Sequence, residues 1–219
     1  MAEKINQQMS VTDIGMLVAL SVLWGGSFFF VEVLIEYLPP LTIVTLRVGL
    51  AALILWGLII VLKIPIPKTR QYWAALTVVG LLSNALPFCL IVWGQTQISS
   101  GLASIFNATT SFFTVIVAGI FLVDEQIRRQ KIIGVIFGIF GVIILVGPEA
   151  LRGLNGPVFG QLAVMGASIS YALSSVYSRR FKDWGLPPLV VVTGQVSMAT
   201  LILFPIMLIV DKPWEQPFI

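Results

Sequence analysis

The sequence predicts an all-α integral membrane protein, and two observations support that prediction. Hydrophobic residues make up 58% of the 219 residues and charged residues 11%, against about 45–50% and about 25% in soluble domains. The hydrophobic residues also fall into long runs, and roughly 20 apolar residues are enough to cross a bilayer as a helix. We therefore expect seven transmembrane helices, at residues 14–35, 41–62, 72–93, 101–123, 131–147, 158–179 and 188–210.

The first run is predicted to remain in the protein as a transmembrane helix. Its apolar stretch is too long for a cleaved signal peptide, and no A-x-A-like cleavage site follows it. The chain has no His and one Cys, Cys89, which excludes an internal disulfide and removes the usual zinc and copper ligands. It also lacks a Gly-Lys-Ser/Thr phosphate-binding loop. We therefore expect no enzyme activity, no metal, no cofactor and no nucleic-acid partner.

One segment of the chain occurs twice. Leu38-Pro39-Pro40-Leu41 returns as Leu186-Pro187-Pro188-Leu189, 148 residues later, and ten of the seventeen positions counted from Pro39 and Pro187 are identical. Repeated halves in a membrane protein are typical of transporters. We expect residues 1–148 to form a first repeat of five helices, and residues 149–219 to form the first two helices of a second, truncated repeat.

Basic residues are distributed unequally between the loops. Lys and Arg in short loops mark the cytoplasmic side. Ten of them lie in the N-terminal segment and in alternate loops, whereas two, Arg152 and Lys212, lie in the other segments. We therefore predict a multi-pass protein of the plasma (inner) membrane with a cytoplasmic N-terminus. Since five helices are an odd number, the second repeat runs inverted, and inverted repeats place a substrate site near the membrane midplane.

Several motifs resemble the EamA-type repeat of the drug/metabolite transporter superfamily. The resemblance covers essentially the whole chain and implies a ten-helix carrier of small metabolites, built from two inverted five-helix repeats. After Thr109-Thr110, where many members have Pro, this chain has Ser111, which puts a helix break at that place in doubt. The motifs that resemble the family are Leu23-Trp24-Gly25-Gly26-Ser27-Phe28, Thr45-Leu46-Arg47, Ser99-Ser100-Gly101-Leu102-Ala103-Ser104, Asn107-Ala108-Thr109-Thr110, Phe121-Leu122-Val123-Asp124-Glu125 and residues 168–180.

Two charged residues, Glu32 and Arg47, lie inside the apolar runs. They are about equally far from the Pro39-Pro40 turn, so an antiparallel hairpin would bring them to the same depth. A charge inside a transmembrane helix costs roughly 2.5–3.5 kcal/mol on insertion scales, so we expect a structural ion pair. The alternatives are that Glu32 titrates during transport, that Arg47 faces an anionic substrate, or that each side chain extends separately to the outer interface.

Uncharged polar residues inside the runs are candidates for a substrate cavity. Asn107, Thr110 and Ser111 fall, together with Thr114, on one face of a helix. This spacing fits cavity lining and helix–helix contact equally well. Asn84 precedes Pro87, which we expect to kink its helix toward the cavity by freeing a backbone carbonyl.

Aromatic residues supply further cavity candidates. Trp24 and Tyr171 occupy corresponding positions in the two repeats and could stack on a substrate, the alternative for Trp24 being packing around neighbouring glycines. Trp93 is a candidate for an outer gate. Gln95, near the outer end of its run, is expected at the membrane interface instead.

These observations predict a secondary transporter that moves small metabolites or drugs, including amino-acid-like solutes, by alternating access. Protons or a counter-substrate would supply the driving force. Gly134 and Gly138 form a GxxxG pair in the fifth helix, which could pack within the bundle or form a homodimer face. The alternative functions are a channel, a structural membrane subunit, or an inactive fragment that needs the missing helices.

Overall fold

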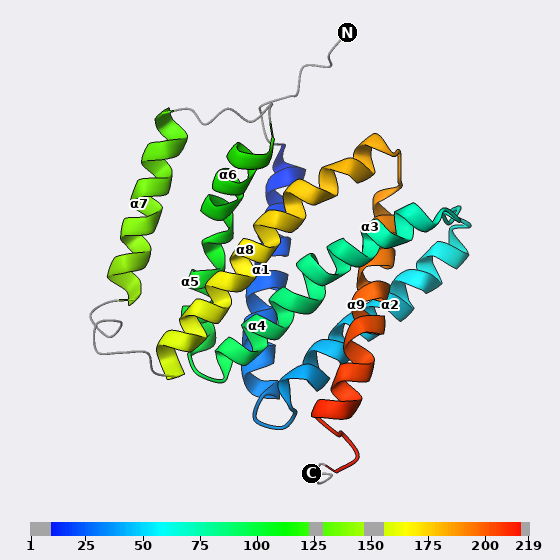
Figure 1. The fold of residues 1–219 in the computed structure, drawn as a ribbon, viewed down its shortest axis with the longest axis horizontal. Helices are drawn as coiled ribbons and strands as arrows, with labels where there is room; N and C mark the ends of the chain where they lie inside the picture. The colour runs from blue at the N-terminus through cyan, green and yellow to red at the C-terminus, as the bar shows by residue number, and fades with distance from the viewer. Residues whose placement is uncertain (1–9, 123–128, 147–155, 216–219) are drawn as a thin grey trace.

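A computed structural model describes residues 10–122, 129–146 and 156–215 of the chain (Figure 1). Within these ranges the chain is helical apart from its turns, which confirms the predicted all-α class. The elements are α1 (Val11–Leu34), α2 (Pro40–Val61), α3 (Arg70–Gly80), the π-helical segment η1 (Leu81–Ala85), α4 (Leu86–Gln95), α5 (Ser100–Ala108), α6 (Thr110–Phe121), α7 (Arg129–Val146), α8 (Gly156–Asp183) and α9 (Pro188–Val210).

Six helical stretches in the described part of the chain are long and apolar enough to cross a membrane. One of them joins α3, η1 and α4, and another joins α5 and α6; the other four are α1, α2, α8 and α9. They coincide with six of the predicted runs. The predicted run 131–147 also forms a helix, α7, with 18 residues, but it is not one of the six. A count of seven spans therefore stays a prediction.

The two LPPL segments start helices in the same way. Pro40 and Pro188 are the first residues of α2 and α9. Proline suits this position because the first N–H groups of a helix have no intrahelical acceptor, and because its fixed φ is close to the helical value. The two helices have 22 and 23 residues. A lysine in the left-handed region follows each of them, Lys63 with φ 52° and Lys212 with φ 43°. The sequence repeat is thus also a repeat of local structure.

The helices α8 and α9 pack against helices of the predicted first repeat. The helix α9 lies along α2 and α3, whereas α8 lies along α4, α5 and α6. Figure 1 shows that α1 and α8 run in opposite directions, and so do α2 and α9. The corresponding helices of the two predicted repeats are therefore inverted with respect to one another.

Two glycine contacts bring helix backbones close together. A Cβ atom on Gly80 would lie 2.5 Å from the carbonyl oxygen of Gln195 in α9, and a Cβ atom on Gly94 would lie 3.0 Å from that of Gly160 in α8. Small residues allow such close approach in membrane proteins, where dispersion forces hold the helices together. These two contacts fix how α3 and α4 meet α8 and α9.

The third span is interrupted where the sequence predicts a kink. The π-helical segment η1 lies directly before Pro87, and the backbone N–H of Leu86 bonds to the carbonyl oxygen of Leu81, five residues back. Pro87 has no N–H to donate to the preceding turn, and a π-type turn is one way in which a helix accommodates this loss.

The fourth span is also interrupted, at the place where Ser111 had put a helix break in doubt. The helix α5 ends at Ala108 and α6 begins at Thr110, although no proline follows the threonine pair. The hydroxyl of Thr109 donates to the carbonyl of Phe106 at 2.6 Å, and that of Thr110 donates to the carbonyl of Asn107 at 2.7 Å. Hydroxyls that bond to nearby carbonyls compete with the backbone N–H groups of a helix. The threonines therefore accompany a break without proline.

Candidate functional site

A small pocket lies where α1, α2, α4 and α8 meet, and we call it the central pocket. It holds about 310 Å³ of space between atoms, a figure that includes the part open to the outside. Both predicted repeats contribute to its wall. The lining residues are Trp24, Ser27, Phe28, Val31, Arg47, Phe88, Ile91, Val92, Gln95 and Tyr171.

Three sequence candidates, Trp24, Arg47 and Tyr171, meet in the central pocket. The guanidinium carbon of Arg47 lies 4.3 Å from the centroid of the Phe88 ring. The Tyr171 ring meets the same phenylalanine edge to face, with centroids 6.5 Å apart. A cation over an aromatic face gains about 0.5–2 kcal/mol, depending on how far the pair is desolvated. Phe88 thus fixes the positions of both the charged group and the phenol.

Two buried polar atoms in the central pocket have no hydrogen-bond partner in the described chain. They are Oη of Tyr171 and Oε1 of Gln95. The other end of the Gln95 amide, Nε2, donates to the carbonyl oxygen of Phe28 at 2.9 Å. Because buried polar groups normally find a partner, these two atoms are available to a ligand or to water.

Gln95 corrects the prediction of an interfacial side chain, because it is 4% exposed. It lies at the end of α4, but α1 and α8 both pack against that helix and cover it. Phe28 and Phe88 were also missed. Phe28 closes the Trp24-Gly25-Gly26-Ser27-Phe28 motif and Phe88 follows Pro87, yet a phenylalanine in an apolar run does not reveal whether it faces lipid or protein.

Trp24 also lines a second cavity, between α1 and α5. Its wall includes Ser21, Ser104 and Asn107. Asn107 is 8% exposed, and its Oδ1 atom has no partner among the described residues. The Trp24 side chain therefore lies between Asn107 on one side and the central pocket on the other.

Serines of α8 bind both helix interruptions. Ser170 donates its hydroxyl to the carbonyl oxygen of Leu82 in η1 at 2.7 Å. The hydroxyl of Ser168 lies 3.3 Å from the carbonyl oxygens of both Phe106 and Asn107, just before the break at Thr109. Asn84 is buried in η1 and does not line the central pocket. Ser170 thus supplies a donor to a carbonyl of the π-helical turn. Ser168 lies against two carbonyls at the other break, and these also accept from the Thr109 and Thr110 hydroxyls.

Glu32 and Arg47 contact different partners, so the expected ion pair is not formed in this structure. Glu32 accepts hydrogen bonds from the backbone N–H of Ser100, at 3.3 Å, and from the Ser100 hydroxyl. The assumed hairpin is the reason for the difference, because α1 lies along α5 and α4 whereas α2 lies along α9 and α4. A carboxylate at the start of α5 suits the positive end of that helix. Proton coupling through Glu32 stays a prediction.

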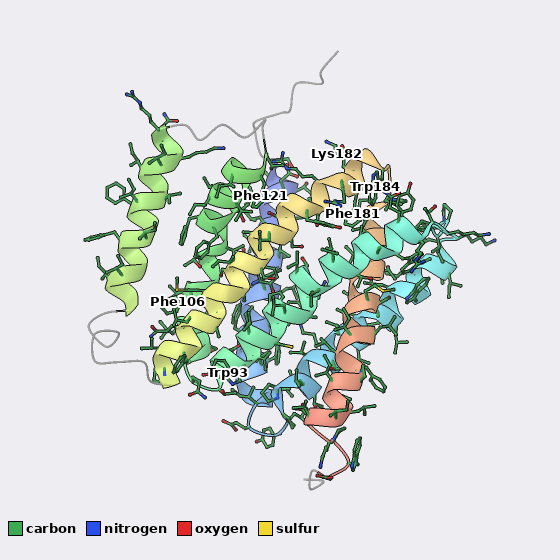
Figure 2. The ribbon with its side chains drawn as sticks, in the orientation of Figure 1. Trp93, Phe106, Phe121, Phe181, Lys182 and Trp184 are labelled. Carbon is green, nitrogen blue, oxygen red and sulfur yellow. The ribbon has the colours of Figure 1, made fainter. Side chains whose placement is uncertain are left out.

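The remaining candidates are spread over the bundle. Thr110 bonds to a backbone carbonyl, Ser111 is exposed, and Trp93 is 44% exposed. Figure 2 shows Trp93 at one end of the bundle, with Lys182 and Trp184 at the opposite end. The break at Thr109 also divides the stripe that was expected to share one face. Cavity lining by Thr110, Ser111 and Trp93 stays a prediction.

The GxxxG pair of α7 has one contact within the bundle. A Cβ atom on Gly138 would lie 3.5 Å from the Phe112 side chain of α6, whereas a Cβ atom on Gly134 would meet no atom of the described chain within 4 Å. Packing inside the bundle therefore involves Gly138. The homodimer face stays a prediction.

Comparisons with known proteins give one family. The model of the EamA-like transporter family matches residues 12–147. "Uncharacterized inner membrane transporter YedA" of Escherichia coli (strain K12) is 28% identical, over 76% of this chain and 53% of the relative. "Uncharacterized transporter YoaV" of Bacillus subtilis (strain 168) is 23% identical, over 74% of this chain and 56% of the relative.

A third relative carries a more specific description. "Probable amino-acid metabolite efflux pump" of Escherichia coli (strain K12) is 27% identical, over 83% of this chain and 58% of the relative. The chain thus spans little more than half the length of these curated relatives. No solved structure matches it.

Proposed function

Because this chain belongs to the EamA-like transporter family, we propose that it acts as a secondary transporter that moves small organic solutes by alternating access. The observation that carries the proposal is the central pocket. Trp24 of α1 and Tyr171 of α8, which lie within one position of correspondence in the two predicted repeats, both line it. A site between inverted repeats can be exposed to one side and then to the other as the repeats rock against each other.

The proposed solutes include amino-acid-like metabolites. A relative with 27% identity is described as a probable amino-acid metabolite efflux pump. The pocket is small, and its wall combines aromatic rings with a few polar groups, which suits a small solute that has both an apolar and a polar part. Protons or a counter-substrate are proposed as the driving force.

For the whole transporter, the proposed architecture is the ten-helix arrangement of two five-helix repeats. The proposed location is the plasma membrane, with the N-terminus on the cytoplasmic side. Two basic segments support this orientation. The turn between α2 and α3 carries Lys63 and Lys68, the end of α8 carries Lys182, and Figure 1 shows both at the end of the bundle opposite the α1–α2 turn. Basic residues gather on the cytoplasmic side.

Counterflow in proteoliposomes tests the proposal. The purified chain is reconstituted and the vesicles are loaded with an unlabelled amino-acid mixture, and entry of the same amino acids in labelled form is followed. A carrier gives saturable uptake that the internal solute accelerates, because its site returns loaded. Liposomes that contain an unrelated membrane protein are the control. Uptake that neither saturates nor responds to internal solute indicates a channel, and no uptake above the control contradicts transport by this chain.

A further inference from the structure

The central pocket is lined by a cationic side chain, Arg47 of α2. The charge of Arg47 lies in the membrane-spanning part of α2, eight residues into the helix, about 10 Å from its start at 1.5 Å per residue. In the described part of the chain Arg47 takes part in no ion pair. Its cation–π contact with Phe88 stabilises it by about 0.5–2 kcal/mol. This is less than the roughly 2.5–3.5 kcal/mol that a charge inside a transmembrane helix costs. The arrangement leaves the guanidinium's hydrogen-bond donors for another molecule.

The neighbours of Arg47 favour an anion. The Tyr171 hydroxyl, which lacks a partner, lines the same pocket and can donate a second hydrogen bond. Guanidinium groups bind planar carboxylates through two parallel N–H···O bonds. Glu32, the acidic residue nearest in the sequence within α1, is bound to Ser100 instead.

The rest of the wall favours an apolar group on the same ligand. Trp24, Phe28 and Phe88 present rings, and Ile91 and Val92 present aliphatic side chains. Gln95 adds one acceptor, Oε1, for a hydroxyl or amino group of the ligand. This wall suits a small solute that has an apolar part beside its polar group.

We propose that the central pocket binds the carboxylate of a small apolar organic acid, with Arg47 as the anion-binding residue and Tyr171 as a second donor. This inference rests on the proposed transport function and names the chemical class of the solute. Binding pairs the Arg47 charge with a carboxylate, so an acid gains a contact that its uncharged amide cannot make.

Calorimetric titration of the purified chain tests this with a matched pair of probes, 3-phenylpropionate and 3-phenylpropionamide. They have nearly the same shape and differ in charge. The acid is expected to bind at least about tenfold more tightly, which corresponds to roughly 1.4 kcal/mol. In Arg47→Gln the difference is expected to fall to less than about threefold. Arg47→Lys keeps the charge without the two-pronged geometry, and Tyr171→Phe keeps the ring, so both should lie in between.

Arg180 supplies a matched control. Its guanidinium carbon lies 3.4 Å from the Tyr177 ring centroid, in a different cavity between α6 and α8. Arg180→Gln should therefore leave the preference for the acid unchanged. The helicity and the thermal midpoint show whether each variant is folded. If Arg47→Gln does not fold, Arg47→Lys still tests the inference.

Three results would overturn the inference: equal binding of acid and amide, an acid preference that survives in Arg47→Gln, or no binding of either probe at millimolar concentration. Each can be told apart from failure of the proposed function. If one of these results is found and the same protein still shows saturable counterflow of other solutes, the transport function stands and the role of Arg47 does not. Absence of any counterflow would remove transport, whatever the probes do.

Discussion

The hydroxyl of Ser170 on α8 donates to the carbonyl oxygen of Leu82 in η1 at 2.7 Å. Ser170 is 3% exposed, so water does not readily replace this donor. The bond links a continuous helix to an interrupted one and satisfies a backbone acceptor in the π-helical turn.

Replacing Ser170 by Ala should therefore destabilise the protein. A buried acceptor that loses its donor costs about 1–3 kcal/mol, so the thermal midpoint in detergent should fall by several degrees. Ser175→Ala is the matched control, because Ser175 is exposed and bonds within α8 itself, to the carbonyl of Ala172 at 2.8 Å. Equal midpoints for the two variants would contradict the structural role of the Ser170 bond.

Gly80→Ala is expected to be more harmful. The new methyl group would lie 2.5 Å from the Gln195 carbonyl oxygen and 3.2 Å from the Ala199 backbone nitrogen. Neither backbone atom can move alone, so the helices must separate, at a cost of about 1–3 kcal/mol or more. Gly57→Ala, on α2, meets no described atom within 4 Å and should keep the wild-type midpoint in a thermal unfolding scan. A stable Gly80→Ala variant would show that α3 and α9 lie farther apart.

Glu32→Gln should abolish uptake driven by a pH gradient while exchange without a gradient continues. Glutamine cannot release a proton, but its amide oxygen can still accept a hydrogen bond from Ser100. The measurement compares gradient-driven uptake with counterflow in the same proteoliposomes. Glu36→Gln, an exposed residue beyond the end of α1, is the control. Gradient-driven uptake that persists in Glu32→Gln would assign Glu32 to holding α5 in place.

Asp211→Ala should loosen the contact between the end of α9 and the start of α2. The Oδ2 atom of Asp211 accepts hydrogen bonds from the backbone N–H of Thr42 at 2.6 Å and from its hydroxyl at 2.7 Å. Loss of such a capping contact costs about 0.5–2 kcal/mol, and chemical denaturation can measure it. Glu215→Ala removes an exposed pair with Lys212 and should change little. A smaller loss for Asp211→Ala than for Glu215→Ala would rule out the cap.

Much of the fold could be predicted, because hydrophobic runs and prolines act locally. The runs predicted after the two LPPL turns began within one residue of the starts of α2 and α9. The neighbours of each helix could not be predicted so directly. Adjacent runs were assumed to form hairpins, but α1 and α2 diverge, and Glu32 therefore binds Ser100 at the start of α5. Which helices touch depends on contacts such as those of Gly80 and Gly94, which have no signature in a single run.

Part of the candidate site could also be predicted, because some of its residues stand out locally in the sequence. Trp24, Arg47 and Tyr171 were identified because they are unusual residues in apolar segments, and they meet in one pocket. Phe88 is an ordinary residue in such a segment, and only the packing of α4 reveals its contact with Arg47. The break at Thr109 could not be predicted from the sequence, because the hydrogen bonds from the threonine hydroxyls to backbone carbonyls depend on the rotamers of these side chains.

The contact of Gly94 with Gly160 restricts how α4 and α8 can move. The site of a Cβ atom on Gly94 lies 2.8 Å from the Val164 side chain, and that of one on Gly160 lies 2.8 Å from the Gln97 side chain. Side chains beside the crossing therefore block sliding along either axis, so the two helices are held in register where their backbones meet.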